Sequence, residues 1–288
     1  MPENSVTADQ AAAQQPAAAA QPAAAPVHPA RGGQGSEALL RVEGLTMRFG
    51  GVVAVNDVSF EIARGTAVGL IGPNGAGKTT ALKAIGGELQ PTSGAVFFDG
   101  VNIAGRPPHV AARHGLIRTF QLGGEFGRLT VMENLLIAVP GMRGQSFWGA
   151  LAGRRWWGAA QEAEVHRARE ILTRLDLRHK DNEYACDLSG GQRKLVEIGR
   201  ALMARPKMLL LDEPMAGVNR SLARHIEEAL KALRDEGLTL LLVEHELASV
   251  ERLCDRVIVM AQGRQIADGD MGQLRSREEV LSAYLGGR

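Results

Sequence analysis

The chain has 288 residues, with 33 basic and 32 acidic side chains and a formal net charge of +1. Such a balance produces no strong positive field, which argues against a nucleic-acid-binding protein. The sequence has no apolar run near the roughly 18 residues that a membrane-spanning helix needs. Its two cysteines have no metal-site spacing. These features predict a soluble or peripheral protein that reaches a membrane only through a partner.

Residues 1–38 differ in composition from the rest of the chain. The segment AAAQQPAAAAQPAAAPVHP consists mainly of Ala, Gln and Pro, and it lacks the basic start and Leu-rich centre of a secretory signal. Because this composition cannot build an apolar core, we predict a disordered tail, with an Ala-rich partner-binding helix as the alternative. We place the folded domain at residues 39–288.

The folded part alternates between strand and helix patterns. After strand-rich sequence that leads to TAVGLI (66–71), a largely helical stretch covers about 122–200. Strands are then expected at 207–212, 238–244 and 256–260, and helices at 221–235 and 246–253. This alternation is typical of a parallel sheet with helices on both faces. We therefore predict an α/β domain with a mostly parallel sheet and an inserted helical subdomain.

The segment GPNGAGKTT (72–80) stands between a predicted strand and a predicted helix. Glycines at 72, 75 and 77 permit a positive φ, so that backbone N–H groups can point at phosphates, next to the positive end of a helix dipole. Lys78 is expected to reach the β- and γ-phosphate oxygens, and the Thr79 hydroxyl to ligate Mg²⁺. The predicted nucleotide-contacting residues are Gly72, Pro73, Asn74, Gly75, Ala76, Gly77, Lys78, Thr79 and Thr80.

The segment MLLLDEP (208–214) is an apolar run that ends in two carboxylates. An uninterrupted apolar run is expected for a central parallel strand that is covered on both faces. Asp212 is predicted to hold Mg²⁺ through a water, and Glu213 to orient the attacking water or to take its proton. Taken alone, acidic residues at a strand end are common. Their distance from the next motif makes the prediction specific.

That motif is LSGGQ (188–192), which opens a predicted amphipathic helix with Ser189 as its N-cap. Taken alone, the segment fits a loop before a helix equally well. Because the chain already has one phosphate loop, a second anion-seeking helix start is best explained by a second nucleotide across an interface. The predicted contacts to that nucleotide are Ser189, Gly190, Gly191 and Gln192.

The three motifs, in this order, resemble those of an ATP-binding subunit of an ABC transporter, over residues 39–288. The resemblance implies a P-loop NTPase (RecA-like) core with an N-terminal antiparallel β part. It also implies ATP and Mg²⁺ as ligands, and hydrolysis of ATP to ADP and phosphate. The active form would be a head-to-tail dimer whose second ATP-binding subunit is identical or paralogous.

The resemblance assigns roles to three further residues, and at a fourth position the chain departs from the family pattern. Phe49, in MRFGG, matches the aromatic position that stacks on adenine, with a core residue as the alternative. Gln121, in RTFQ, matches the glutamine that contacts Mg²⁺ and the attacking water, with a solvated strand-end residue as the alternative. His245, in VEHEL, matches the histidine that contacts the γ-phosphate. Asn219 departs from the family pattern, in which an Asp faces the partner subunit.

Short segments such as RTFQ, LTVMENLLIA (129–138) and AYLG resemble the branched-chain amino-acid importers. This likeness implies membrane-spanning permease subunits, an indirectly acting solute-binding protein and a peripheral place at the cytoplasmic face of the inner membrane. Cargo could also be other amino acids or amides. ATPases that move lipids or lipopolysaccharide are the nearest alternative.

Two alternatives lie outside transport. Non-transport cassette ATPases usually have two cassettes or a long heptad insert, and neither appears in this sequence. A nucleotide-binding regulator without hydrolysis is disfavoured because Glu213 and His245 are both present.

Deletion of residues 1–35 is expected to leave the melting temperature and the rate of ATP hydrolysis nearly unchanged, because a segment without an apolar core has few contacts to lose. Thermal unfolding and phosphate release of the truncated and full-length chains measure this. A fall of many degrees in the melting temperature would mean that the tail docks on the domain.

Overall fold

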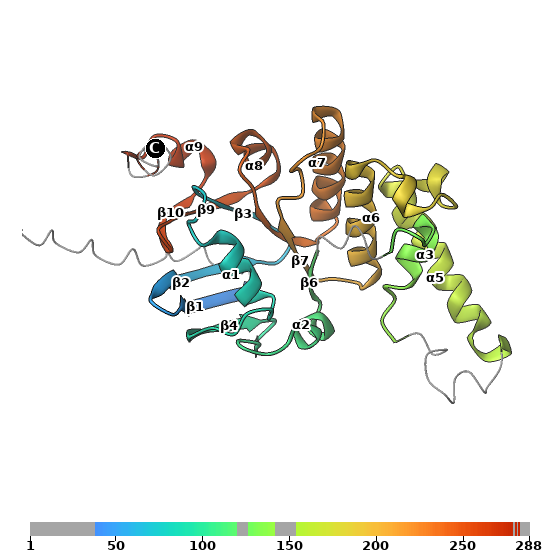
Figure 1. Ribbon diagram of the computed structural model, residues 1–288, viewed down its shortest axis with the longest axis horizontal. Coiled ribbons are helices and arrows are strands. Elements are labelled where there is room, and N and C mark those ends of the chain that lie inside the picture. The colour runs from blue at the N-terminus through green and yellow to red at the C-terminus, as the bar shows by residue number, and fades with distance from the viewer. Residues whose placement is uncertain (1–37, 120–125, 142–153, 279, 281, 283–288) are drawn as a thin grey trace, which may run out of the picture.

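The computed structural model describes residues 38–119, 126–141, 154–278, 280 and 282 (Figure 1). The strands are β1 (Ala38–Phe49), β2 (Val52–Ala63), β3 (Ala67–Ile71), β4 (Ser93–Phe98), β5 (Val101–Asn102), β6 (Leu116–Arg118), β7 (Met208–Asp212), β8 (Thr239–Val243), β9 (Arg256–Ala261) and β10 (Arg264–Gly269). The helices are α1 (Lys78–Ile85), α2 (Pro108–His114), α3 (Val131–Leu136), α5 (Arg154–Arg174), α6 (Gly190–Met203), α7 (Arg220–Asp235), α8 (Leu247–Leu253) and α9 (Met271–Leu274), with 3₁₀ turns η2 (Arg178–Lys180) and η3 (Ala185–Asp187).

A six-stranded sheet in the order β10-β9-β3-β8-β7-β6 forms the core of the domain. Its neighbours from β9 to β6 pair in parallel, and β10 pairs antiparallel with β9. Every residue of β3 and β8 is buried, as is expected when both faces of a parallel sheet are covered. The predicted mostly parallel sheet is thus confirmed.

The N-terminal part is a separate antiparallel sheet in the order β2-β1-β4-β5, which confirms the expected antiparallel β part. Helix α1 contacts strands of both sheets, and Figure 1 shows it between them. Its side chains Ala81, Leu82 and Ile85 are buried in a cluster that also includes Leu210 of β7 and Leu241 of β8. The helix that follows the phosphate loop is therefore fixed by packing on both sides.

Helices α3, α5 and α6 pack against one another and lie at one side of the molecule, away from the antiparallel sheet (Figure 1). Leu135, Ile171 and Leu195 join them in one apolar cluster that continues to Leu209 and Leu211 of β7. The described helices α3 and α5 and most of α6 fall within the range of about 122–200 that the sequence analysis predicts to be helical, and α6 ends at Met203. Within the described part of the chain, none of the helices has the length and apolar character needed to cross a bilayer.

Candidate nucleotide site

The phosphate loop joins β3 to α1, and Gly77 is the residue that caps α1. The predicted positive φ is present at Gly72 (147°), Gly75 (78°) and Gly77 (94°). At Gly77 an added Cβ would lie 2.3 Å from the carbonyl oxygen of Ala54, which is far inside contact distance. The loop can therefore take this path only with glycine at that position.

Lys78 is buried, with 5% of its surface exposed, and its ammonium lies over the loop. Its Nζ donates hydrogen bonds to the carbonyl oxygens of Gly72 (2.8 Å) and Pro73 (2.9 Å). Burial lowers the pKa of Lys78, and the negative charges of Glu213 and Asp212 oppose this shift. The ammonium thus stands where the loop and both acidic residues meet.

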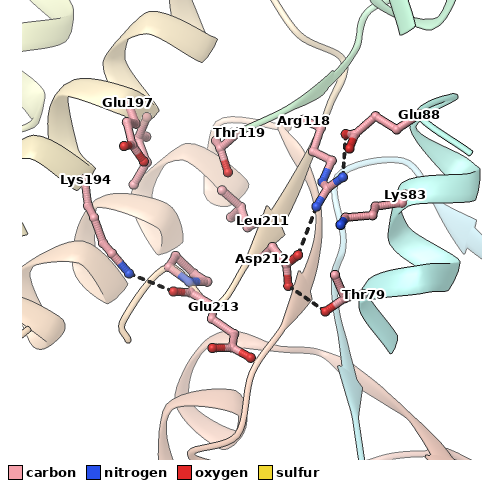
Figure 2. Close-up of a pocket in the computed structure, with 12 residues that line it drawn as sticks. Thr79, Lys83, Glu88, Arg118, Thr119, Lys194, Glu197, Leu211, Asp212 and Glu213 are labelled. Carbon is pink, nitrogen blue, oxygen red and sulfur yellow. Dashed lines mark hydrogen bonds and ion pairs between the residues drawn. The ribbon is translucent and has the colours of Figure 1, made fainter. Parts of the chain in front are cut away.

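Asp212 ends β7 with its two carboxylate oxygens facing different partners (Figure 2). Oδ1 accepts a hydrogen bond from the Thr79 hydroxyl at 3.3 Å, and Oδ2 accepts one from Arg118 Nη2 at 2.9 Å. Arg118 also forms an ion pair with Glu88. The arginine fixes the orientation of Asp212 so that one oxygen stays beside Thr79. No local pattern marks Arg118 for this role, since it is only the first residue of RTFQ, three residues before Gln121.

Glu213 and His245 contact each other directly. Glu213 Oε1 lies 2.6 Å from His245 Nε2, which is hydrogen-bonding distance. Both side chains are part-exposed and line one cavity together with residues of the phosphate loop. The cavity is lined by Ala54, Asn74, Gly75, Ala76, Gly77, Lys78, Thr79, Thr80, Glu213 and His245. The phosphate loop, Ala54, Glu213 and His245, which lie at four separate places in the sequence, therefore line the same cavity.

Ser189 caps α6 as predicted. Its hydroxyl accepts a hydrogen bond from Gln192 N (3.3 Å), and the Gln192 side chain accepts one from Ser189 N (3.0 Å), which forms a capping box. Gly190 and Gly191 form the first turn of this helix. Ser189 and Gln192 line a hollow that does not include the phosphate loop, so the LSGGQ segment lies apart from the cavity of its own chain.

Asn219 lines that same hollow, and its side chain is used within its own chain. As the N-cap of α7, its Oδ1 accepts hydrogen bonds from Leu222 N (3.0 Å) and Ser221 Oγ (2.9 Å). The asparagine oxygen accepts the capping hydrogen bond as an aspartate oxygen would, but asparagine adds no charge.

Phe49 is placed outside this cavity. Phe49 is the last residue of β1 and is 49% exposed, so the alternative of a core residue is wrong. Its ring is not among the side chains that line the cavity. Gln121 lies outside the described residues.

Residues 55–216 match the model of a protein family described as ABC transporter. The chain belongs to the ABC transporter family. It is 39% identical over 252 residues to the high-affinity branched-chain amino acid transport ATP-binding protein BraF of Pseudomonas aeruginosa, with 87% of this chain and 99% of BraF covered. It is also 39% identical over 248 residues to the probable branched-chain amino acid transport ATP-binding protein LivG of Archaeoglobus fulgidus, with 86% and 95% covered.

A solved structure supports the same assignment. An ATP-binding cassette of an ABC transporter, crystallised in its ADP conformation, superposes with a TM-score of 0.76 at 38% identity, and the match covers 87% of this chain and all of that one. This ABC chain therefore has the P-loop NTPase fold, binds ATP and is an ATPase.

Replacement of Gly191 by Ala is expected to destabilise the domain by about 1–3 kcal/mol, because a well-packed site has no room for an added methyl group. A Cβ at Gly191 would lie 2.1 Å from Leu222 Cδ2. Chemical denaturation measures the change in the free energy of unfolding.

Gly190→Ala is the matched control. A Cβ there has Arg193 Nη2 as its nearest neighbour, at 3.9 Å, and alanine favours a helix. Equal stability of the two variants would contradict a close contact between Gly191 of α6 and Leu222 of α7.

Proposed function

We propose that this chain is the ATP-hydrolysing subunit of an ABC importer that takes up branched-chain amino acids or related amino acids and amides. The observation that carries the hydrolytic part is that Glu213 and His245 share one cavity with Lys78 and Thr79. The names of BraF and LivG, which align over nearly their whole length, support the cargo and favour it over lipid or lipopolysaccharide. We assign these activities to residues 39–288.

The phosphate loop is proposed to bind the α-, β- and γ-phosphates through its backbone N–H groups and Lys78. Successive N–H groups in a glycine-rich turn form a concave anion site, and the start of α1 adds the positive end of a helix dipole. Lys78 supplies the positive charge, which the negative charges of Glu213 and Asp212 help to retain. Phe49, half of whose surface is exposed, is proposed to stack on adenine.

Thr79 and Asp212 are proposed to hold Mg²⁺, with Gln121 as a third contact. A hydroxyl and a carboxylate oxygen 3.3 Å apart fit a cation that binds oxygen ligands and is usually held by few protein groups together with phosphates and waters. When bound, Mg²⁺ neutralises charge on the phosphate oxygens. Arg118 keeps Asp212 oriented towards Thr79 without occupying the oxygen that faces the hydroxyl.

Glu213 is proposed to orient the attacking water and to accept its proton. Its hydrogen bond to His245 restricts where the carboxylate can point, which favours one geometry for the water. His245 is proposed to contact the γ-phosphate as well, so that the two groups bracket the reacting centre. Hydrolysis then yields ADP and phosphate, with the proton of the water held on Glu213.

The LSGGQ segment is proposed to act on the nucleotide of a second ATP-binding subunit in a head-to-tail dimer. Support comes from the separation of Ser189 from the phosphate loop of its own chain and from the capped helix start that it forms. The proposed contacts are Ser189, Gly190, Gly191 and Gln192. Through permease subunits, the dimer would sit at the cytoplasmic face of the inner membrane, and a solute-binding protein would act on it indirectly.

Lys78→Ala is expected to weaken ATP binding and to reduce hydrolysis below about a tenth of the wild-type rate, because one charge-assisted contact to phosphate is worth several kcal/mol in the transition state. Titration with ATP and a phosphate-release assay measure the two effects. The matched control is the exposed Lys231 of α7, whose replacement by Ala should change neither. Wild-type turnover by Lys78→Ala would rule out the assigned phosphate contact.

Glu213→Gln is expected to slow hydrolysis by about 10²–10⁴-fold while ATP still binds, because the change removes a general base but keeps the size of the side chain. The stalled protein should accumulate as a dimer with ATP and return to monomer with ADP. Size-exclusion chromatography with each nucleotide measures this, for the isolated chain and for its complex with permeases. Near wild-type hydrolysis would place the catalytic carboxylate elsewhere.

A further inference from the structure

The backbone of Glu213 lies in the left-handed region, with φ at 50°. A residue with a Cβ adopts this region at a cost in free energy, so surrounding contacts must hold it there. Three main-chain contacts do so. The Glu213 carbonyl accepts a hydrogen bond from Ala216 N at 3.1 Å. The Glu213 N–H donates to the carbonyl oxygen of Val243 in β8 at 2.9 Å. The Glu213 carbonyl accepts a hydrogen bond from Lys194 Nζ, also at 2.9 Å.

Lys194 belongs to the second turn of α6, the helix that Ser189 caps. Figure 2 shows its ammonium pointing at the backbone oxygen of Glu213, while the Glu213 carboxylate extends to the other side. Burial lowers the pKa of the Lys194 ammonium. Negative charges on Glu197, Glu244 and Glu213 oppose that shift. The lysine is thus a part-buried cation among carboxylates, with its hydrogen bond directed at the main chain.

A buried carboxylate holds the next part of the same loop. Glu244 is only 4% exposed, and its Oε1 accepts a hydrogen bond from Met215 N at 3.0 Å. Its Oε2 accepts one from His245 N at 3.3 Å. Burial raises the pKa of Glu244, and these two backbone donors oppose the shift. The Glu244 carboxylate therefore links the loop after β7 to the backbone of His245, while Lys194 links the same loop to α6.

We propose that Lys194 is a positioning residue: through its hydrogen bond to the Glu213 carbonyl, it makes the position of the Glu213 backbone depend on the position of α6. This inference rests on the proposed function, in which Glu213 acts on the ATP of its own chain and Ser189 contacts the ATP of the partner. Under that arrangement, a shift of α6 on engagement of the partner's ATP moves Lys194, and Lys194 moves the backbone of Glu213. The two ATP sites of the dimer are then coupled through one hydrogen bond within each chain.

Lys194→Met tests this, because methionine keeps the unbranched apolar stem and removes the donor and the charge. The turnover number should fall by about 10- to 100-fold, the effect expected when a catalytic group is displaced by roughly an ångström. Lys194 lines a cavity with Thr79, Asp212 and Glu213, but its ammonium is directed at the main chain of Glu213. The KM for ATP should therefore stay within a few-fold of wild type. The Hill coefficient for ATP should fall towards one, and Lys194→Arg should restore part of the turnover. Lys231→Met, on the exposed face of α7, is the matched control.

Thermal unfolding of each variant distinguishes positioning from simple support of the fold. The proposal is overturned if Lys194→Met hydrolyses ATP at the wild-type rate with an unchanged Hill coefficient. It is also overturned if turnover falls only together with the melting temperature and the affinity for ATP. The Glu213→Gln assay, run in parallel, distinguishes failure of the proposed function from failure of the coupling. Active Glu213→Gln protein would refute the proposed function. A normal Lys194→Met protein beside an inactive Glu213→Gln protein would refute only the coupling through Lys194.

Discussion

The parallel pairing of β3, β8 and β7 is the constraint on which the site depends. Leu70 of β3 pairs with Val243 of β8, and Val243 also pairs with Asp212 of β7, so the three strands end at one level. Since the strands run in the same direction, the residues after each of them emerge at the same edge. The phosphate loop, Glu213 and His245 are brought together in this way from positions more than 160 residues apart in the sequence, counted from Lys78 to His245.

Hydrogen bonds from neighbouring side chains then orient the carboxylates of Asp212 and Glu213 at this edge of the sheet. Arg118 holds one oxygen of Asp212, and His245 holds one oxygen of Glu213. The main chain of the loop after β7 is held separately, by Lys194 from α6 and by Glu244 from the end of β8. Glu213 is thus oriented by a neighbour within the cavity, His245, and the main chain of its loop by groups of α6 and of the segment after β8. A loop with a residue in the left-handed region needs such support to remain in one conformation.

The sequence predicted the parts of this structure that depend on local pattern. Apolar runs at 66–71 and 207–212 became β3 and β7, and the serine before an amphipathic helix became its cap. Short elements such as β5, β6 and α9 were not predicted, because two to four residues do not establish a periodicity. Lys194 and Glu244 were also missed. Their importance comes from hydrogen bonds across 19 and 29 residues, and a lysine in an amphipathic helix or a glutamate after a strand carries no local sign of such a contact.

In the proposed head-to-tail dimer each chain supplies half of two ATP sites, which a mixture of two inactive variants can verify. Lys78→Ala disables the phosphate-loop half, and Ser189→Arg blocks the LSGGQ half with a large side chain. A mixed dimer would contain one site with both halves intact. An equimolar mixture should therefore regain ATP hydrolysis well above the mean of the two separate proteins. A mixture that stays at that mean would show that one chain completes its own site, and the head-to-tail arrangement would be wrong.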